Sequence, residues 1–178
     1  AYVFNPALNV IELLRTICDE FHVPVTPAGA VATRKDHVDA LNAYLLRTHA
    51  QGQYNVLIVD EAQNLSVPVL EQLRLLTNLE TDERKLLQIV LIGQPELRRL
   101  LARPELEQVA QRVIARYHLE PLGEAETVQY VAHRLAAAGL QGPPPFDRAA
   151  MRRLVHHSRG IPRRINLLAD RALLGAFA

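Results

Sequence analysis

Short apolar runs alternate with segments of helical periodicity over the first two thirds of the chain. Residues 56–59 are all apolar and lead directly into two acidic residues. The run at 88–92, which is apolar after Gln88, ends at a Gly-Gln-Pro turn. A fully apolar run such as 56–59 is typical of a strand buried on both faces of a parallel sheet. Elsewhere apolar residues recur every three or four positions, which predicts amphipathic helices. The alternation predicts an α/β domain.

The pattern also predicts where individual elements begin. Asn9 with Glu12, and Thr33 with Asp36, have the spacing of helix capping pairs, and Ser66 can cap a further helix that has proline in its first turn. Strands are expected at 1–4, 56–59, 88–92 and 116–119, and further helices at 96–101 and 105–113.

From residue 122 onward the pattern is helical throughout. Helices are predicted at 124–138, 147–158 and 162–177, and glycine- and proline-containing breaks separate them. We therefore expect two domains, a partial α/β core at 1–121 and a helical domain at 122–178.

Composition and charge exclude several classes of protein. Of the 178 residues, 49% are hydrophobic and 22% are charged, which is a globular composition and excludes a disordered or collagen-like chain. The net charge of +1 gives no overall attraction to nucleic acid or anionic membranes. Cys18 is the only cysteine, and no apolar run is long enough to span a bilayer. We expect the chain as given to be soluble in a reducing compartment. The histidines show no metal-ligand spacing.

The strongest candidate chemistry is the pair Asp60 and Glu61 at the end of the apolar strand. Parallel α/β sheets bind their ligands at the carboxyl ends of strands. In P-loop nucleotide hydrolases, the first acid of such a pair holds Mg²⁺ and the second polarises the attacking water. The alternative is that both acids only begin the next helix, where negative charge suits the helix dipole.

Several motifs in order carry a family resemblance. They comprise residues 56–65, 73–79, 92–97, 110–112, 117–122 and 160–173. Over nearly the whole chain this order resembles the secretion-associated AAA+ ATPases of the general secretion pathway protein A type. The resemblance implies a three-layer P-loop NTPase (AAA+) core with a truncated parallel sheet, followed by a C-terminal α-helical lid.

The resemblance also implies roles for single residues. Asp60 would hold Mg²⁺, and Glu61 would polarise the water that attacks the γ-phosphate of ATP. Gln94 matches the first sensor, whose amide can orient that water. Arg163 matches the second sensor, whose guanidinium binds the β- and γ-phosphates. The structural alternatives are that Gln94 satisfies the turn before Pro95 and that Arg163 is a solvated residue at a helix start.

Arg112 precedes the last expected strand, and Arg116 is the first residue of that strand. In AAA+ proteins this region carries the arginine that completes a neighbouring subunit's site, and that role implies self-association into a ring or hexamer. Arg112 is the first choice and Arg116 the second. Either residue can instead form an ordinary surface ion pair.

The sequence departs from the family at the phosphate-binding loop. A P-loop, Gly-x-x-x-x-Gly-Lys-Ser/Thr, holds phosphates with backbone N–H groups and a lysine. Neither Lys35 nor Lys85 lies in such a run. In the family the loop comes just before a segment resembling residues 1–6. We expect a chain truncated at its front, rather than a naturally degenerate relative, that binds ATP poorly and whose unpaired strand edges favour strand exchange.

The resemblance implies that the intact protein hydrolyses Mg·ATP to support assembly of the type II secretion apparatus in the cell envelope. It would be a cytoplasmic domain of a bacterial inner-membrane-associated protein, with secretion-pathway envelope proteins as partners. Two other classes stay open, a DNA-linked AAA+ ATPase and a non-hydrolysing interaction module.

Residues 148–171 bear on these alternatives, because they hold seven arginines and one aspartate, a net charge of +6. Such a surface can face phosphates from the lid, contact nucleic acid or lipid headgroups, or be a solvated helix face. No aromatic residues interleave with the arginines, which argues against stacking on single strands.

Overall fold

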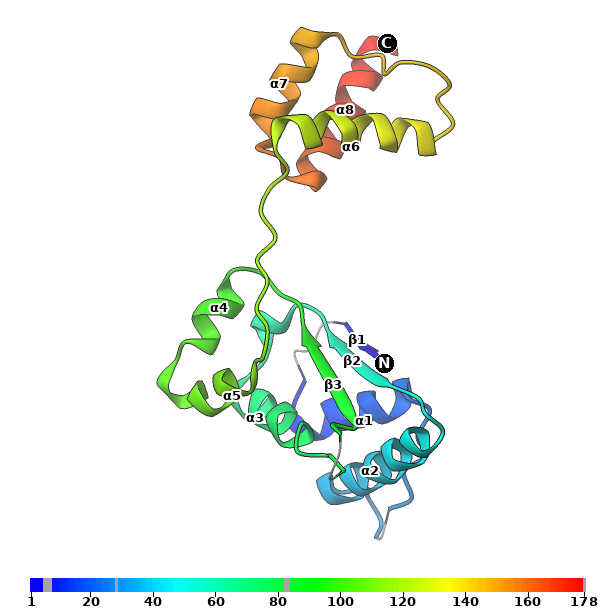
Figure 1. The fold of residues 1–178 in the computed structure, drawn as a ribbon, viewed down its shortest axis with the longest axis vertical. Helices are drawn as coiled ribbons and strands as arrows, with labels where there is room; N and C mark the ends of the chain where they lie inside the picture. The colour runs from blue at the N-terminus through cyan, green and yellow to red at the C-terminus, as the bar shows by residue number, and fades with distance from the viewer. Residues whose placement is uncertain (5–7, 28, 82–83, 178) are drawn as a thin grey trace. The chain divides into compact units, whose positions relative to one another are not determined.

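The computed structural model describes the chain except residues 5–7, 28, 82–83 and 178. It divides into two compact units, Ala1–Ala115 and Arg116–Ala178 (Figure 1). The division lies N-terminal to the boundary at 121 that the sequence pattern suggests. Residues 5 and 6 of the segment that resembles the family lie outside the described residues.

The first unit contains a parallel sheet of three strands in the order β1-β2-β3. These strands are β1 (Tyr2–Val3), β2 (Asn55–Val59) and β3 (Leu87–Leu91). Residues of β2 pair in register with β3, from Asn55 opposite Leu87 to Val59 opposite Leu91. Helices connect each strand to the next, so the carboxyl ends of the strands lie at the same edge of the sheet.

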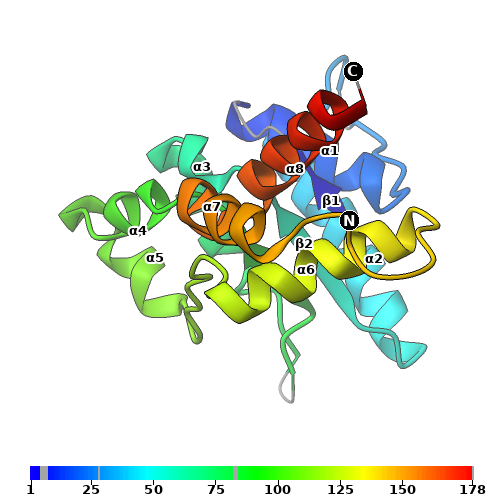
Figure 2. The same cartoon turned by 90° about the horizontal axis from the view of Figure 1, so that it is seen from above.

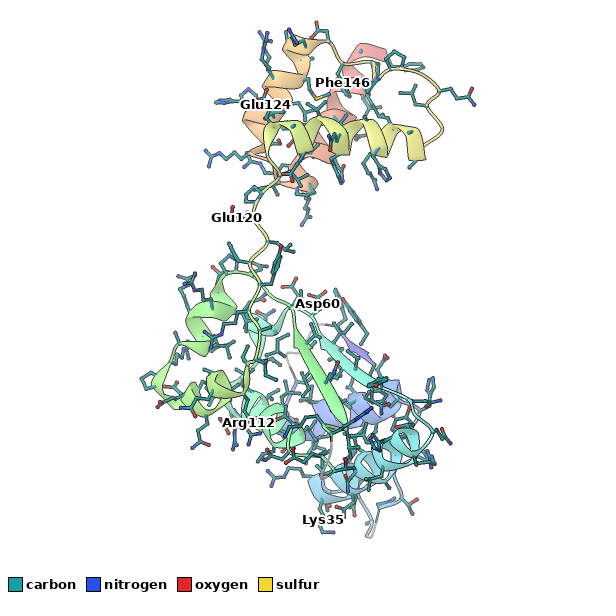
Figure 3. All side chains as sticks on the ribbon, in the orientation of Figure 1. Lys35, Asp60, Arg112, Glu120, Glu124 and Phe146 are labelled. Atoms are coloured by element: carbon teal, nitrogen blue, oxygen red, sulfur yellow. The ribbon has the colours of Figure 1, made fainter. Side chains whose placement is uncertain are left out.

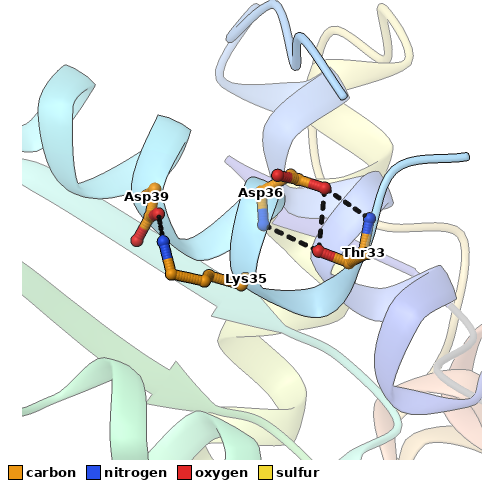
Figure 4. A network of polar contacts seen from close by, with 4 residues as sticks. All are labelled: Thr33, Lys35, Asp36 and Asp39. Carbon is orange, nitrogen blue, oxygen red and sulfur yellow. Dashed lines mark hydrogen bonds and ion pairs between the residues drawn. The ribbon is translucent and has the colours of Figure 1, made fainter. Parts of the chain in front are cut away.

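Capping boxes fix the starts of the two helices between β1 and β2, α1 (Val10–Glu20) and α2 (Arg34–Ala50). At α2, the Thr33 N–H donates to the Asp36 carboxylate at 2.8 Å, and the Asp36 N–H donates back to the Thr33 hydroxyl at 3.3 Å (Figure 4). The equivalent box at Asn9 begins α1. The capping predictions are therefore confirmed at both helices.

The remaining helices of the first unit are short. Ser66 occupies the N-cap position of α3, as expected, but its side chain makes no capping hydrogen bond. The remaining helical elements of the first unit are η1 (Ala62–Asn64), α3 (Val67–Leu76), α4 (Glu96–Leu101), η2 (Pro104–Leu106) and α5 (Glu107–Arg112).

The core of the first unit lies on one face of the sheet. Val3, Leu57 and Val59 are buried in one cluster with apolar residues of α1, α2, α3 and α5. The opposite face carries Tyr2 and Val90, each 43% exposed, and the partly buried Val56 and Ile58. The expectation that β2 is buried on both faces is therefore wrong for the described structure. An apolar strand sequence cannot specify which of its faces the fold covers.

Cys18 lies in this core and is 1% exposed. Its Sγ contacts the carbonyl oxygen of His37 at 3.7 Å. Loss of hydration, with a smaller contribution from the negative charge of Asp19, raises the pKa of the thiol to about 11. The side chain is therefore a neutral packing residue at physiological pH.

The second unit contains three helices, α6 (Glu124–Ala137), α7 (Arg148–Ser158) and α8 (Pro162–Phe177). Helix α8 packs against both α6 and α7 (Figure 2). Val131, Met151, Leu154 and Ile165 form a separate small core. The three helices expected from the sequence are confirmed.

Residues 116–119 do not form the expected strand. No helix or strand is assigned between residues 113 and 123, and the side chains of Tyr117 and Leu119 are 91% and 83% exposed. A strand exists only where a neighbouring strand supplies hydrogen-bond partners, and none of the three described strands pairs with this segment. The apolar and aromatic side chains of Leu119 and Tyr117 therefore misled the sequence interpretation.

Among the described helices, none combines the length and the apolar character that crossing a membrane would require.

Gly160 holds the segment that leads into α6 through a backbone contact with Leu122. Its carbonyl accepts a hydrogen bond from the Leu122 N–H at 2.9 Å, and its φ is 70°. A Cβ at this position would lie 2.0 Å from the Leu122 carbonyl oxygen. Backbone atoms cannot yield to such a contact as a flexible side chain can, so the position requires glycine.

We therefore expect Gly160→Ala to lower the free energy of unfolding of the second unit by about 2 kcal/mol or more, through steric overlap and backbone strain. Gly175→Ala is the matched control, because a Cβ there meets no atom within 4 Å. Inside α8 it should be neutral or stabilise by up to about 1 kcal/mol. Urea unfolding followed by circular dichroism measures both, and an equal loss in the two variants would contradict this account.

Candidate active site

Polar side chains gather at the carboxyl edge of the sheet. Asp60 and Glu61 directly follow β2, and Gln94 follows β3 after Ile92 and Gly93. Figure 3 shows Asp60 at this end of the strands. Because β2 and β3 are parallel and in register, the fold brings these three predicted site residues together.

Asp60 is held by two hydrogen bonds. The Tyr2 hydroxyl donates to Oδ2 at 2.6 Å, and the Glu61 backbone N–H donates to Oδ1 at 2.8 Å. The Tyr2 bond, and after it the Glu61 amide, lowers the pKa of Asp60 below its ordinary value, against a smaller opposing effect of burial. The same bond is the largest cause of the raised pKa of Tyr2. Asp60 is therefore an ionised carboxylate of fixed orientation.

The backbone of Glu61 is in the left-handed region, with φ 52° and ψ 34°. A residue other than glycine adopts this conformation at an energetic cost, so the surrounding structure must enforce it. One enforcing contact is the Ala62 N–H, which donates to the Ile92 carbonyl at 2.8 Å and ties the turn after β2 to the end of β3. Similar strain is common at functional sites.

Gln63 connects the two predicted site residues on the neighbouring strand ends. Its Nε2 donates to Glu61 Oε2 at 2.5 Å, and its Oε1 accepts the Gln94 backbone N–H at 3.0 Å. Gln94 Nε2 also approaches the same Glu61 oxygen, at 3.5 Å. We did not assign a role to Gln63 from the sequence. The glycine at position 93 was a sequence feature that could have indicated it. A Cβ there would lie 2.7 Å from Gln63 Oε1, so the missing side chain leaves space for the Gln63 amide.

Three predicted arginines lie outside this cluster. Arg112 ends α5 and lies near Glu80, close to the amino end of β3 and opposite the Asp60 edge. The bond and charge of Lys85 lower the pKa of Glu80, and the charge of Arg112 adds a smaller contribution in the same direction. Figure 3 likewise shows Arg112 away from Asp60. Arg116 and Arg163 belong to the second unit, so they are not among the side chains that the first unit assembles.

Neither lysine lies at the carboxyl edge. Lys35, in the first turn of α2, forms an ion pair with Asp39 at 2.5 Å (Figure 4). Lys85 pairs with Glu80 just before β3. Both ion pairs lie at the edge of the sheet where the strands begin. Neither lysine can therefore act as a phosphate-binding lysine beside Asp60.

The carboxylates are the metal-binding candidates of this edge. Within the described residues, no group of three or more His, Cys, Asp or Glu side chains could hold a metal ion by itself. Carboxylate oxygens suit Mg²⁺, which usually keeps several waters and takes one or two protein carboxylates together with substrate phosphates. The donor set at Asp60 fits that mode of binding.

Comparison with known proteins identifies the family. A family model described as AAA domain matches residues 1–101. The chain belongs to the AAA domain family. The crystal structure of Cdc6p from Pyrobaculum aerophilum matches this AAA domain with a TM-score of 0.66, over 98% of this chain and 48% of that one. At 18% identity, that likeness supports the fold alone, and the expected AAA+ α/β fold is confirmed.

A curated relative is much more similar in sequence. General secretion pathway protein A of Aeromonas hydrophila is 52% identical over all 178 residues. The chain spans 32% of the length of that relative. The AAA domain therefore resembles one part of a longer protein, which confirms the resemblance inferred from the ordered motifs.

The bond between Tyr2 and Asp60 leads to a pH-dependent prediction. We expect Tyr2→Phe to raise the pKa of Asp60 toward its ordinary value, because the carboxylate loses its strongest donor. A lowered pKa in the folded state stabilises the protein above the unfolded-state pKa, and this stabilisation is lost as the pH falls. The variant should therefore lose less stability on acidification than the wild type.

Carboxyl-carbon NMR titration of Asp60 measures this change. Tyr54→Phe is the matched control, because it also removes a tyrosine hydroxyl, but one that accepts a bond from Arg84. An Asp60 titration that is identical in wild type and Tyr2→Phe would show that the hydroxyl does not set the pKa.

Proposed function

We propose that this AAA domain is the ATP-hydrolysing module of a general secretion pathway component. The observation that carries the proposal is that Asp60, Glu61 and Gln94 lie close together at the carboxyl edge of the sheet. Similarity to General secretion pathway protein A along the whole chain supports it further. The reaction is attack of a water on the γ-phosphate of ATP.

Glu61 orients and polarises the attacking water. Its Oε2 accepts bonds from Gln63 and, at the limit of hydrogen bonding, from Gln94. Among the described residues no group donates a hydrogen bond to the other carboxylate oxygen, which is suited to accept a proton from water. Gln94 is exposed, and its amide can bind the same water or a phosphate oxygen with little rearrangement.

Asp60 holds Mg²⁺ in this proposal, directly or through a water. When bound, the ion neutralises charge on the phosphates. Tyr2 contributes by fixing the carboxylate, since its hydroxyl donates to Oδ2 at 2.6 Å. The orientation of Asp60 is thus set before the ion arrives, which reduces the entropy lost on binding.

Arginines complete the site in the proposal. Arg163, exposed in the first turn of α8, serves as the lid sensor for the β- and γ-phosphates. Arg112, or else Arg116, acts on ATP in a neighbouring subunit, which requires self-association into a ring or hexamer. Guanidinium groups are suited to both tasks because they are permanently charged and bind phosphate oxygens in pairs.

Similarity to the longer relative supports a proposal for the role of the whole protein. We infer that ATP hydrolysis supports assembly of the type II secretion apparatus in the cell envelope. The AAA domain would act on the cytoplasmic side of a bacterial inner-membrane-associated protein. Its partners would be envelope proteins of the secretion pathway.

The second unit favours one alternative, a DNA-linked AAA+ ATPase. Its seven arginines between residues 148 and 171 are all exposed, and they belong largely to α7 and α8. Such a surface can bind nucleic-acid phosphates, and the affinity would fall steeply with added salt. Binding of duplex DNA that is salt-sensitive and stimulates hydrolysis would favour this alternative over the secretion role.

A substitution at Glu61 tests hydrolysis. In the whole protein, Glu61→Gln is expected to lower kcat by a factor of ten or more, about 1.4 kcal/mol or more on the barrier, because an amide cannot accept the proton. Affinity for Mg·ATP should change little. Glu71→Gln, on α3, is the control, since Glu71 pairs with Arg74 at 2.8 Å. Turnover that stays at the uncatalysed level in both the wild type and Glu61→Gln would indicate a non-hydrolysing interaction module.

Calorimetric titration with Mg·ATP tests what these 178 residues contribute to binding. Their sequence contains no Gly-x-x-x-x-Gly-Lys-Ser/Thr run, and both lysines are paired with acids away from the carboxyl edge. We therefore expect no binding heat at micromolar concentrations of this chain. Micromolar affinity would contradict the requirement for a P-loop.

A further inference from the structure

We propose that Gln63 is a positioning residue that joins the Glu61 carboxylate and the backbone at Gln94 into one unit. This inference rests on the proposed hydrolysis and names a residue through which Glu61 acts. The amide of Gln63 lies between the ends of β2 and β3, with one bond to each side.

The two bonds require an amide. Gln63 Nε2 donates to Glu61 Oε2 at 2.5 Å, while Oε1 accepts the Gln94 N–H at 3.0 Å. Glutamate could accept from the N–H but would repel Glu61, and an alkyl side chain could do neither. The two partners also fix which end of the amide is nitrogen, because only one orientation satisfies both.

The backbone is shaped to receive this side chain. A Cβ on Gly93 would lie 2.7 Å from Gln63 Oε1 and 3.3 Å from the Gln63 backbone nitrogen. Any other residue at 93 would therefore push the amide away from the strand end. The absence of a side chain at Gly93 and the amide of Gln63 form a complementary pair.

The strained turn shows why Glu61 needs this support. The left-handed backbone of Glu61 turns the chain sharply after β2, and the residue is only partly buried. A carboxylate on such a turn can occupy several rotamers unless a bond selects one. The bond to Gln63 selects a rotamer and links it to the strand end that carries Gln94. A shift of Gln94 on binding a phosphate or water would thus move Glu61 as well.

Amide hydrogen exchange tests the link in this chain without nucleotide. We expect Gln63→Met to speed exchange of the Gln94 N–H by about tenfold, since its acceptor is lost. Gln63→Glu keeps an acceptor and should change that exchange by less than about twofold. Gln111→Met is the matched control, because Gln111 also donates to a glutamate, Glu107, but on α5. Unchanged exchange in Gln63→Met would overturn the inference.

Hydrolysis by the whole protein tests the consequence for Glu61. Both Gln63 variants should lower kcat by about tenfold with KM for ATP unchanged, and Gln111→Met should alter neither. In a Glu61→Gln background, Gln63→Met should add less than about a twofold loss, because the two residues act as one unit. A full additional tenfold loss there would overturn the inference.

The two experiments separate failure of this inference from failure of the proposed function. If Glu61→Gln leaves hydrolysis unchanged, the proposed function is wrong, and the exchange measurement alone still decides whether Gln63 holds the strand end. If Glu61→Gln abolishes hydrolysis while both Gln63 variants keep full kcat, the proposed function stands and the positioning role is wrong.

Discussion

The in-register parallel pairing of β2 with β3 is the constraint on which the rest of the structure depends. It aligns Val59 with Leu91, so the residues that follow each strand emerge at the same edge of the sheet. The bonds that join Glu61, Gln63 and Gln94 are made there, and so is the bond from the Ala62 N–H to the Ile92 carbonyl. A one-residue slip would turn the side chains of a strand to the opposite face and separate the site residues.

Burial on one face of the sheet supports this pairing. The cluster around Leu57 and Val59 anchors β2 against the helices, and dense apolar packing resists movement of the strand. The rigid strand then carries a strained, polar turn at its end. This division between a packed scaffold and a strained terminus is a common arrangement in enzymes, because orientation of reacting groups requires a support that does not yield.

The two acids of the site are held in different ways. Asp60 accepts bonds from a tyrosine hydroxyl and a backbone amide, while Glu61 depends on side-chain amides. Hydrogen bonds to an ionised carboxylate are stronger than neutral ones, so each bond restricts its acid appreciably. The structure supplies a partner for each acid, the Tyr2 hydroxyl for Asp60 and the Gln63 amide for Glu61.

The sequence by itself determined the α/β class, both capping boxes, the helices of the second unit and the positions of Asp60, Glu61 and Gln94 after two neighbouring strands. These depend on local spacing, or on motifs whose order survives without coordinates. Tertiary structure alone decided that one face of β2 stays partly open, that residues 116–119 have no strand partner, and that Gln63 lies between two strand ends. Such features arise from pairing and packing between residues far apart in the chain, and no local pattern encodes them.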